Sequence, residues 1–309
     1  MSLRAISRGP KYLRNLLFLL TLALSHFAWA STNIVVVTSS RALVYQQAVD
    51  KLLQQMERRN AELDLSWTQV TLDKLKASPS IVPLNSDLFI TIGSAAAEYM
   101  FEQPSNGALL CSFITRSAYD AIAAKNPTRA NAHAIFMDQP IERFLALAIL
   151  LRKERSRYNI GVLQGQSLSS MSQFKLADVD VNSAILLADK NPAATIEPLV
   201  RSNDVFIVTP SSAYINRLVA RLSLQLSMKY KKPVIGFSQK YAEAGALLSL
   251  YASPEDIGKS TAQTAIAWLE SGKRELSSGA GEQHYTISLN SHVARKYRLQ
   301  LDLEQLYSK

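Results

Sequence analysis

Residues 258–261, Gly-Lys-Ser-Thr, have the side chains of a phosphate-binding loop, in which backbone amides and a lysine hold the phosphates of a nucleotide. Such a loop needs a second glycine five positions before Gly258, and Ser253 stands there. The stretch instead has the features of a helix start, with Ser253 as N-cap, Pro254 in the first turn and Asp256 closing a capping box. We therefore predict an amphipathic helix and no nucleotide site. Its apolar stripe and its end are Ile257, Thr261, Ala265, Trp268, Leu269 and Gly272.

Other short patterns resemble those of enzymes, but each lacks the partners that the chemistry needs. Ser172 and Lys175 match the Ser-x-x-Lys of penicillin-binding proteins and β-lactamases, without the accompanying Ser-Asp-Asn and Lys-Thr-Gly. Residues 236–240 miss the second glycine of a nucleophile elbow. No paired-carboxylate site stands out, although sequence spacing does not test a pair that only folding brings together. We expect no catalytic residue and no cofactor. We also expect no metal site, because the spacing of His133, His284 and His292 is not that of metal ligands.

The elements that must position any site alternate between short β-rich runs and longer helical patterns. Continuous apolar strands with helices between them are typical of parallel sheets that are buried on both faces. The sequence therefore predicts an α/β fold. The runs that we predict as strands are 33–38, 87–93, 108–114, 134–137, 159–165, 181–188, 204–210, 232–238 and 246–252.

Two halves of the chain resemble each other. Residues 87–92 are similar to residues 204–209, which lie 117 positions later, and both stretches begin with aspartate. The first strand is similar to the one that begins at Asn159, 126 positions later. These similar offsets predict two doubly wound parallel-sheet lobes of like topology. Because ligands of such sheets bind beyond the carboxyl ends of the strands, we expect a cleft between the lobes, lined by strand-end loops.

The first 30 residues have the three parts of a secretory signal peptide. A basic leader comes first, a run over 16–24 is apolar apart from Thr21, and Ala-Trp-Ala at 28–30 offers small residues at the cleavage positions. The apolar run is too short to cross about 30 Å of hydrocarbon. We expect cleavage after Ala30 and a periplasmic location. Cys111 is the only cysteine, so the exported protein relies on its core and has no internal disulfide.

The charge of the chain gives little indication of a macromolecular partner. The net charge is +9, and four of the basic residues belong to the N-terminal leader. The densest basic runs, 151–157 and 229–232, are typical of solvated helix ends, where cations favour the negative end of the helix dipole. We expect no nucleic-acid partner, and we expect a monomer.

The C-terminal part of the chain resembles a known family. Residues 231–273 and 285–301 are similar to the periplasmic solute-binding proteins of a family of ABC importers whose better-known members bind aromatic amino acids. Residues 87–100 and 138–165 are similar to a strand-turn-helix of that family and to its crossover into the second lobe. The features that match most specifically are Pro233–Gly236, Gly245–Leu247, Asp256–Gly258 and Asn290–Ala294.

The resemblance implies the type I binding-protein fold, with two α/β lobes, three hinge crossings and a ligand between the lobes. On this reading the first lobe holds residues 31–138 and about 239–274, and the second holds 139–238 and 283–309. The ligand site that the resemblance implies consists of residues that follow strands or begin helices, where free backbone amides can hold a carboxylate. They are Ser39, Ser40, Arg41, Ser94, Ala95, Ser112, Thr115, Gln164, Ser167, Thr209, Pro210, Ser211, Phe237, Ser238 and Gly245.

One departure from the family puts the ligand in doubt. Residues 208–214, Val-Thr-Pro-Ser-Ser-Ala-Tyr, lack the acidic residue with which relatives can bind an α-ammonium, and Asp138, the nearest substitute, belongs to the hinge. We expect a periplasmic component that captures a small solute and delivers it to an inner-membrane ABC permease. The alternative is a sensory or interaction module that acts on a membrane receptor. An exported hydrolase is a third and weaker hypothesis.

Overall fold

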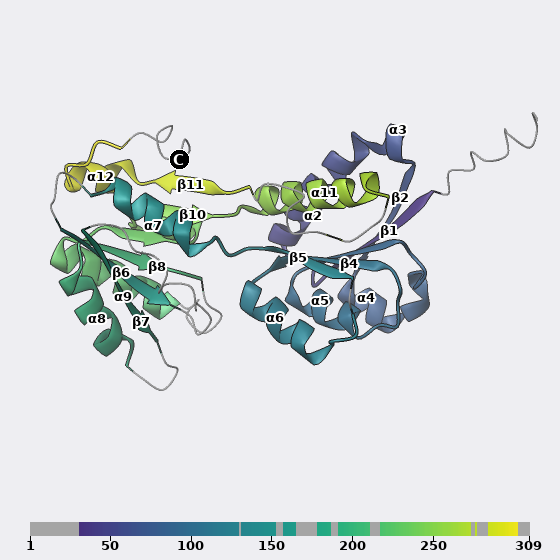
Figure 1. The fold of residues 1–309 in the computed structure, drawn as a ribbon, viewed down its shortest axis with the longest axis horizontal. Coiled ribbons are helices and arrows are strands. Elements are labelled where there is room, and N and C mark those ends of the chain that lie inside the picture. Colours follow the sequence, from purple (N-terminus) through teal and green to yellow (C-terminus); the bar gives the residue numbers. More distant parts are fainter. Residues whose placement is uncertain are drawn as a thin grey trace, which may run out of the picture.

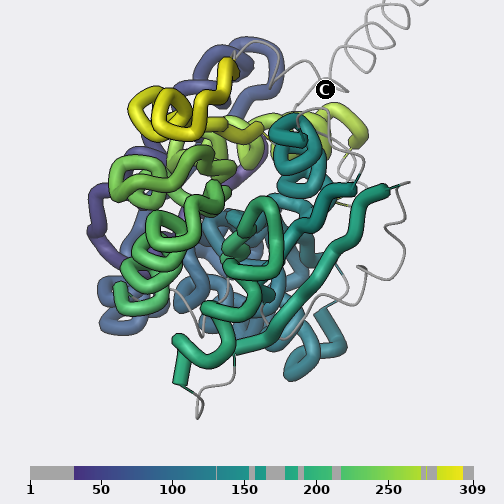
Figure 2. Tube along the Cα trace, turned by 90° about the vertical axis from the view of Figure 1, so that its left-hand side faces the viewer, coloured from purple at the N-terminus to yellow at the C-terminus, as the bar shows by residue number. Residues whose placement is uncertain are grey.

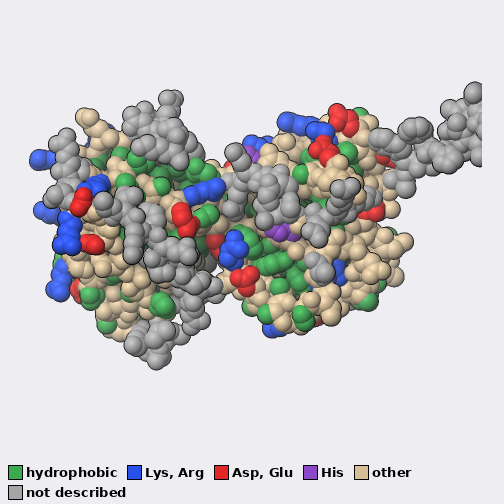
Figure 3. Space-filling model, viewed as in Figure 1, with side chains coloured by type: hydrophobic (Ala, Val, Ile, Leu, Met, Phe, Trp, Pro, Cys, Tyr) green, Lys and Arg blue, Asp and Glu red, His purple; other side chains and the backbone are tan. Residues whose placement is uncertain are grey.

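A computed structural model describes residues 31–129, 131–152, 157–164, 178–186, 191–210, 217–272, 276 and 284–301. In these ranges the chain forms two mostly parallel sheets, each with helices on both faces, and Figure 1 shows them side by side. The space-filling view shows two masses joined by a narrower waist (Figure 3). The proposed signal peptide, residues 1–30, lies outside the described residues. Within the described ranges no helix combines the length and the apolar composition needed to cross a bilayer.

The first lobe is built on a sheet with the strand order β2-β1-β3-β4-β5. One face packs against α2 and the other against α4, α5 and α6, so apolar side chains fill both interfaces. The strands are β1 (Thr32–Thr38), β2 (Leu65–Thr71), β3 (Leu88–Ile92), β4 (Ala108–Ile114) and β5 (Ala132–Phe136). The helices are α2 (Leu43–Glu57), α3 (Asn60–Leu63), α4 (Leu72–Ala77), η1 (Pro79–Ile81), α5 (Ser94–Phe101) and α6 (Arg116–Lys125).

The second lobe has the sheet order β11-β10-β9-β8-β6-β7, in which β11 is antiparallel to β10. Helices α7 and α12 cover one face, and α8, α9 and α10 cover the other. Figure 2, seen along the long axis, shows yellow α12 well apart from green α8. The strands are β6 (Tyr158–Gln164), β7 (Val179–Ile185), β8 (Val205–Val208), β9 (Val234–Gly236), β10 (Leu248–Tyr251) and β11 (Thr286–Leu289). The helices are α7 (Ile141–Leu150), α8 (Pro192–Ser202), α9 (Arg217–Tyr230), α10 (Gln239–Ala244) and α12 (Ser291–Lys296).

The two lobes repeat one topology. In both, the first strand lies between the second and the third, and the fourth and fifth strands follow on the far side of the third. The order β2-β1-β3-β4-β5 thus matches β7-β6-β8-β9-β10, and only β11 is an addition. The prediction of two doubly wound lobes of like topology is confirmed.

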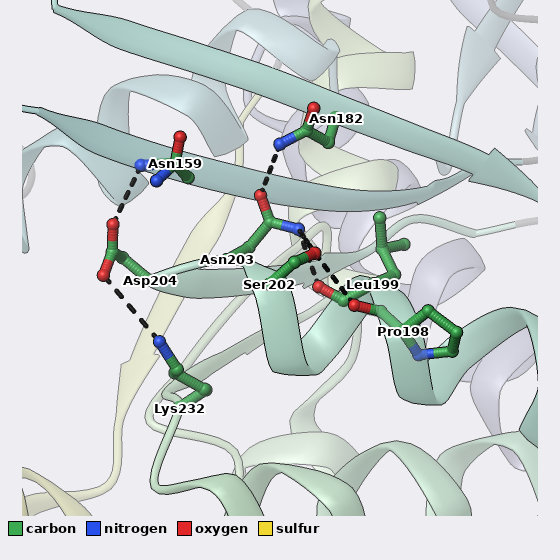
Figure 4. A network of polar contacts seen from close by, with 8 residues as sticks. All are labelled: Asn159, Asn182, Pro198, Leu199, Ser202, Asn203, Asp204 and Lys232. Carbon is green, nitrogen blue, oxygen red and sulfur yellow. Dashed lines mark hydrogen bonds and ion pairs between the residues drawn. The ribbon is translucent and has the colours of Figure 1, made fainter.

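The same aspartate contact recurs where the first and third strands of each lobe begin. The backbone N–H of Asn33 donates to the Asp87 carboxylate at 2.9 Å, and the N–H of Asn159 donates to the Asp204 carboxylate at 2.9 Å. Figure 4 shows the second case, in which Asp204 also lies 3.8 Å from the Lys232 ammonium. The similarity between residues 87–92 and 204–209 therefore marks equivalent strands.

Asn203, next to Asp204, ends α8 and connects it to the sheet. Its amide N–H donates to the Leu199 carbonyl at 2.7 Å, and its amide oxygen accepts from the Asn182 side chain at 2.8 Å (Figure 4). Asn203 is buried, and both its donor and its acceptor are satisfied. These bonds fix the end of α8 against β7.

One predicted domain boundary is wrong. The sequence predicts residues 239–274 in the first lobe, but β10 pairs in parallel with β9, with Leu248 opposite Ile235. Residues 239–251 therefore belong to the second lobe, and the chain returns to the first lobe at about Ala252, just before α11 (Pro254–Glu270). A buried apolar strand fits either sheet, and only the pairing decides which one it joins.

Helix α11 has the predicted start and the predicted face. The Ser253 hydroxyl accepts from the Asp256 N–H, and the Asp256 carboxylate accepts from the Ser253 N–H, both at 3.0 Å. Its apolar stripe packs against α2 in the core of the first lobe. Gly258 lies so close to α2 that an added Cβ would stand 2.3 Å from the Ala48 carbonyl oxygen. The phosphate-loop reading therefore has no support, because this glycine serves helix packing.

Candidate functional site

A cavity of about 620 Å³ lies where the chain passes between the lobes. We call it the hinge-side cavity. It opens beyond the carboxyl ends of β4, β5, β8, β9 and β10, which is where ligands bind in open parallel sheets. Its walls are Thr115, Met137, Asp138, Gln139, Phe144, Pro210, Arg217, Ala220, Leu224, Phe237, Ser238, Lys240, Tyr241, Ala244, Leu250, Tyr251 and Ala252. Most of these side chains are apolar, as is usual for a small-molecule pocket of this size.

Asp138 is the only carboxylate among the described residues of the cavity wall. One carboxylate oxygen, Oδ2, accepts from the backbone N–H of Arg116 at 2.7 Å. The other, Oδ1, is buried and has no hydrogen-bond partner. Burial raises the pKa of this carboxyl to about 6, while the Arg116 N–H and the charge of Arg116 act in the opposite direction. The cavity thus holds an acceptor that the protein leaves unsatisfied.

Gln139, the next residue, offers an unsatisfied donor. Its Oε1 accepts from the Arg143 guanidinium at 2.6 Å, and this contact fixes the orientation of the amide. Its Nε2 is buried without a partner. Unpaired buried polar atoms are rare in folded proteins, and here two of them belong to adjacent residues of one cavity wall.

Aromatic side chains from the second lobe form the opposite wall. The rings of Phe237 and Tyr241 lie 5.1 Å apart, and Tyr241 packs directly over Gly236. A Cβ on Gly236 would stand 2.4 Å from the Tyr241 Cβ, so the glycine permits this position of the ring. Burial raises the pKa of the Tyr241 hydroxyl, which therefore stays protonated at neutral pH.

The chain crosses between the lobes beside this cavity, and side-chain contacts connect the crossings. Arg143, at the start of α7, places its guanidinium 4.4 Å from the centre of the Tyr285 ring, which lies just before β11. Asp256 accepts from the Thr286 hydroxyl at 2.7 Å, and so joins the start of α11 to β11. The imidazole of His284 is 2.9 Å from Gln263 of α11. These contacts connect the start of α7, the start of β11 and α11 to one another.

Comparison with known proteins identifies this architecture. No protein-family model and no curated protein sequence matches the chain. A ligand-free, open substrate-binding protein with adhesive properties from Clostridium difficile matches with a TM-score of 0.62 at 14% identity, over 88% of this chain and 96% of that one. The ABC domain in complex with L-Trp from Streptococcus pneumonia matches with a TM-score of 0.57 at 14% identity, over 90% and 98%. This chain has the type I periplasmic binding-protein fold.

A third structure with this fold extends the range of ligands among the neighbours. A periplasmic ribose ABC transporter protein from Conexibacter woesei matches with a TM-score of 0.52 at 10% identity, over 90% of this chain and 98% of that one. The fold that the sequence resemblance implied is therefore confirmed. At these identities the likeness shows the binding-protein fold alone.

Four of the predicted ligand residues come together in the hinge-side cavity: Thr115, Pro210, Phe237 and Ser238. Thr115 follows β4, Pro210 follows β8 and Ser238 follows β9, as the strand-end rule of this fold requires. Thr115 also caps α6, since its hydroxyl accepts from the Ala118 N–H at 3.2 Å. The Ser238 side chain makes no cap bond to α10. Their role as ligand contacts stays a prediction.

The predicted residues that follow β1 and β3, and Ser112 of β4, are not among the described residues of the cavity wall. The Ser39 hydroxyl accepts from the Ala96 N–H at 2.9 Å and thereby caps the start of α5. The side chains of Ser40, Arg41, Ser94 and Ala95 are exposed. Ser112 is buried in a hydroxyl pair with Thr261 at 2.6 Å, in the contact between β4 and α11.

The remaining predictions fall on structural positions or outside the described residues. Gln164 and Thr209 are buried at the ends of β6 and β8, and the Thr209 hydroxyl donates to the Leu163 carbonyl at 2.9 Å. Gly245 has φ +118 and ends α10 in the left-handed conformation, which favours glycine. Ser167, Ser172, Lys175 and Ser211 lie outside the described residues.

Sequence reasoning missed most of the cavity wall. Arg217, Ala220 and Leu224 line it at positions i, i+3 and i+7 of α9, a helical spacing that marks one face of the helix. Tyr251 ends the last parallel strand and Ala252 follows it, so the strand-end rule could have found them. Among the described residues, no group of three or more histidine, cysteine, aspartate or glutamate side chains could hold a metal ion.

Proposed function

We propose that this protein captures a small solute between its lobes and presents it to an inner-membrane ABC permease, in the periplasm after removal of the N-terminal leader. The hinge-side cavity supports this proposal most directly, because it lies at the strand ends between two lobes and has a volume suited to a small molecule. Burial of the solute by both lobes supplies affinity, and the closed arrangement is what the permease recognises.

The neighbours in fold support transport more than sensing. The Conexibacter woesei protein is described as a ribose ABC transporter, and the Clostridium difficile protein as a substrate-binding protein. None of the three structures named above is described as a sensor. The proposal therefore keeps the permease as the partner.

A broad solute screen tests the proposal. Native mass spectrometry and calorimetry measure binding, and small-angle X-ray scattering measures the radius of gyration with and without each ligand. We expect at least one solute to bind and to reduce the radius of gyration, because closure brings the lobes together. If no solute binds and no closure occurs over a broad panel, solute capture is wrong.

A cavity-filling variant connects binding to this site. Ala220→Trp places an indole in the wall of the hinge-side cavity, and we expect it to abolish solute binding. Met228→Trp is the matched control, because Met228 lies on the same helix and is 63% exposed. The control should bind as the unmodified protein does. Equal binding by both variants would place the solute site elsewhere.

A further inference from the structure

Two unsatisfied polar atoms on wall residues of the hinge-side cavity indicate the chemistry of the proposed solute. Asp138 Oδ1 is an acceptor and Gln139 Nε2 is a donor, and both are buried without a partner. Both residues are wall residues of the same cavity. An unsatisfied buried polar group costs about 1–3 kcal/mol, and more when it is charged, so a fold keeps such a pair most readily where a ligand completes it.

The charges around Asp138 show what kind of group completes it. The nearby charged groups are Arg116 and Asp120 of α6 and, on the cavity wall, Arg217 and Lys240. Arg116 contributes its backbone N–H to Oδ2, while its guanidinium lies 4.0 Å from the centre of the Phe136 ring. None of these cations donates to Oδ1. The buried second oxygen therefore has no donor among the described residues of the protein.

A cationic donor fits this position better than a neutral one. In a largely apolar cavity a carboxylate attracts a positive charge strongly, because little water screens the pair. An ammonium N–H bound to a carboxylate forms a charge-assisted hydrogen bond, about twice as strong as one between neutral groups. Because Oδ1 is buried and Asp138 is a wall residue, the Asp138 side chain must rotate for a donor in the cavity to reach Oδ1.

We propose that the solute carries a protonated amine, which donates to Asp138 Oδ1, and an adjacent acceptor oxygen, which receives the N–H of Gln139 Nε2. This assignment rests on the proposed solute capture. It also places a counter-charge for an amine at the hinge, whereas the segment after β8 supplies no acidic residue. The apolar and aromatic wall then holds the body of the solute.

Matched pairs of probes test the amine directly. The pairs are phenylalaninol with 3-phenylpropan-1-ol, leucinol with 4-methylpentan-1-ol, and glucosamine with glucose. Within each pair the two compounds share the body and the acceptor oxygen, and only the first has the amine. We expect calorimetry at pH 7.5 to show that the amine of at least one pair binds at least about tenfold more tightly than its partner.

Two variants with the same change of charge identify the residue. Asp138→Asn should weaken binding of that amine at least about tenfold, because the amide carries no negative charge. Asp120→Asn is the control, since Asp120 lies near Asp138 but outside the cavity wall, and it should change binding less than about twofold. Thermal unfolding of both variants verifies that they are folded.

The pH dependence gives a readout that a structural role would not produce. Because the Asp138 carboxyl has a pKa of about 6, lowering the pH from 7.5 to 5 should protonate most of it and weaken amine binding roughly tenfold. The other charged groups near Asp138 are Arg116, Asp120, Arg217 and Lys240, and the Asp120→Asn variant removes any contribution from Asp120. Asp138→Asn should bind the amine with no such decrease.

The possible outcomes distinguish a failure of the amine assignment from a failure of the proposed solute capture. If only neutral or acidic compounds bind, or if Asp138→Asn binds the amine as tightly as the unmodified protein, the amine assignment is wrong and solute capture stands. A solute that is released from the purified protein and contains no amine has the same meaning. If nothing binds and the lobes never close, both proposals fail.

Discussion

Single carboxylates at the start of equivalent strands stabilise each lobe. Asp204 accepts from the Asn159 N–H and lies near the Lys232 ammonium, and its side chain is only 15% exposed. A hydrogen bond to a charged acceptor in such a partly buried place contributes about 1.5–3 kcal/mol to stability. Exposed ion pairs contribute less than about 1 kcal/mol, because water screens them.

Asp204→Ala should therefore lower the free energy of unfolding by about 1.5–3 kcal/mol. Urea denaturation followed by circular dichroism measures this. The matched control is Asp180→Ala, which removes a 2.9 Å ion pair with Arg157 whose side chains are 77% and 52% exposed. The control should cost less than about 1 kcal/mol. Equal losses of unfolding free energy in the two variants would show that the hydrogen bond to Asn159 contributes no more to stability than an exposed ion pair.

The charged Asp138 carboxylate lowers the stability of the folded protein, because burial disfavours its charge. Its carboxyl pKa rises from 3.8 to about 6, so the folded protein binds the proton more tightly than the unfolded chain. The stabilisation from this proton is fully present below pH 3.8 and is lost as the pH rises through about 6.

The difference in unfolding free energy between the unmodified protein and Asp138→Asn should reflect this loss. As the pH rises from 4 to 7 without solute, the unmodified protein should lose stability relative to the variant, because only it carries the titrating carboxyl. Urea denaturation at several pH values measures the difference. A difference that stays constant with pH would mean that Asp138 has an ordinary pKa.

Close packing against α2 holds α11 in the first lobe, after the chain has returned from the second lobe. Gly258 stands where the two helices approach most closely, and its Cβ position is blocked by the Ala48 carbonyl oxygen. Helix propensity alone would make an alanine stabilising by roughly 1 kcal/mol. Overpacking a helix contact costs about 1–3 kcal/mol and opposes this gain.

Gly258→Ala should therefore destabilise the protein, because the blocking atom belongs to the backbone and cannot rotate away. The midpoint of thermal unfolding, followed by circular dichroism, measures the effect. A variant more stable than the unmodified protein would show that α11 and α2 can separate without loss, and that propensity decides the outcome.

The strands that the sequence analysis missed are edge strands. Neither β2 nor β11 appears among the predicted runs, and each lies at the rim of its sheet. In β2, exposed Ser66 and Gln69 alternate with buried Leu65 and Val70, so the strand has no continuous apolar run. Central strands such as β3 and β8 are buried at every position, and their runs were recognised.

The two lobes have separate hydrophobic cores. The apolar clusters of the first lobe contain residues of β1–β5 and their helices, and those of the second lobe contain residues of β6–β11 and theirs. The chain has three tryptophans. Trp67 and Trp268 belong to the first lobe, and Trp29 belongs to the predicted leader. Tryptophan fluorescence of the chain without residues 1–30 therefore reports the first lobe alone.

Asp204→Ala, a change in the second lobe, should leave the urea midpoint of the fluorescence transition unchanged while the circular dichroism transition moves to lower urea. We expect this because the described residues of each lobe form their own hydrophobic cores, and such units unfold independently. If both transitions shift together, the contacts at the crossings make the molecule one cooperative unit.

Local patterns in the sequence determined the elements and their repetition. Apolar runs marked the central strands, Ser253 and Asp256 marked the start of α11, and the two Asp-led strands marked the repeated lobe, because these signals depend on neighbours within a few residues. Tertiary structure alone decided that β10 joins the second sheet, since that depends on pairing with a strand apart in sequence. It also decided which residues surround the cavity: Thr115, Pro210, Phe237 and Ser238 were predicted, whereas the environment of Asp138 was not. Burial and an unpaired oxygen arise from packing between segments distant in sequence, which no local pattern records.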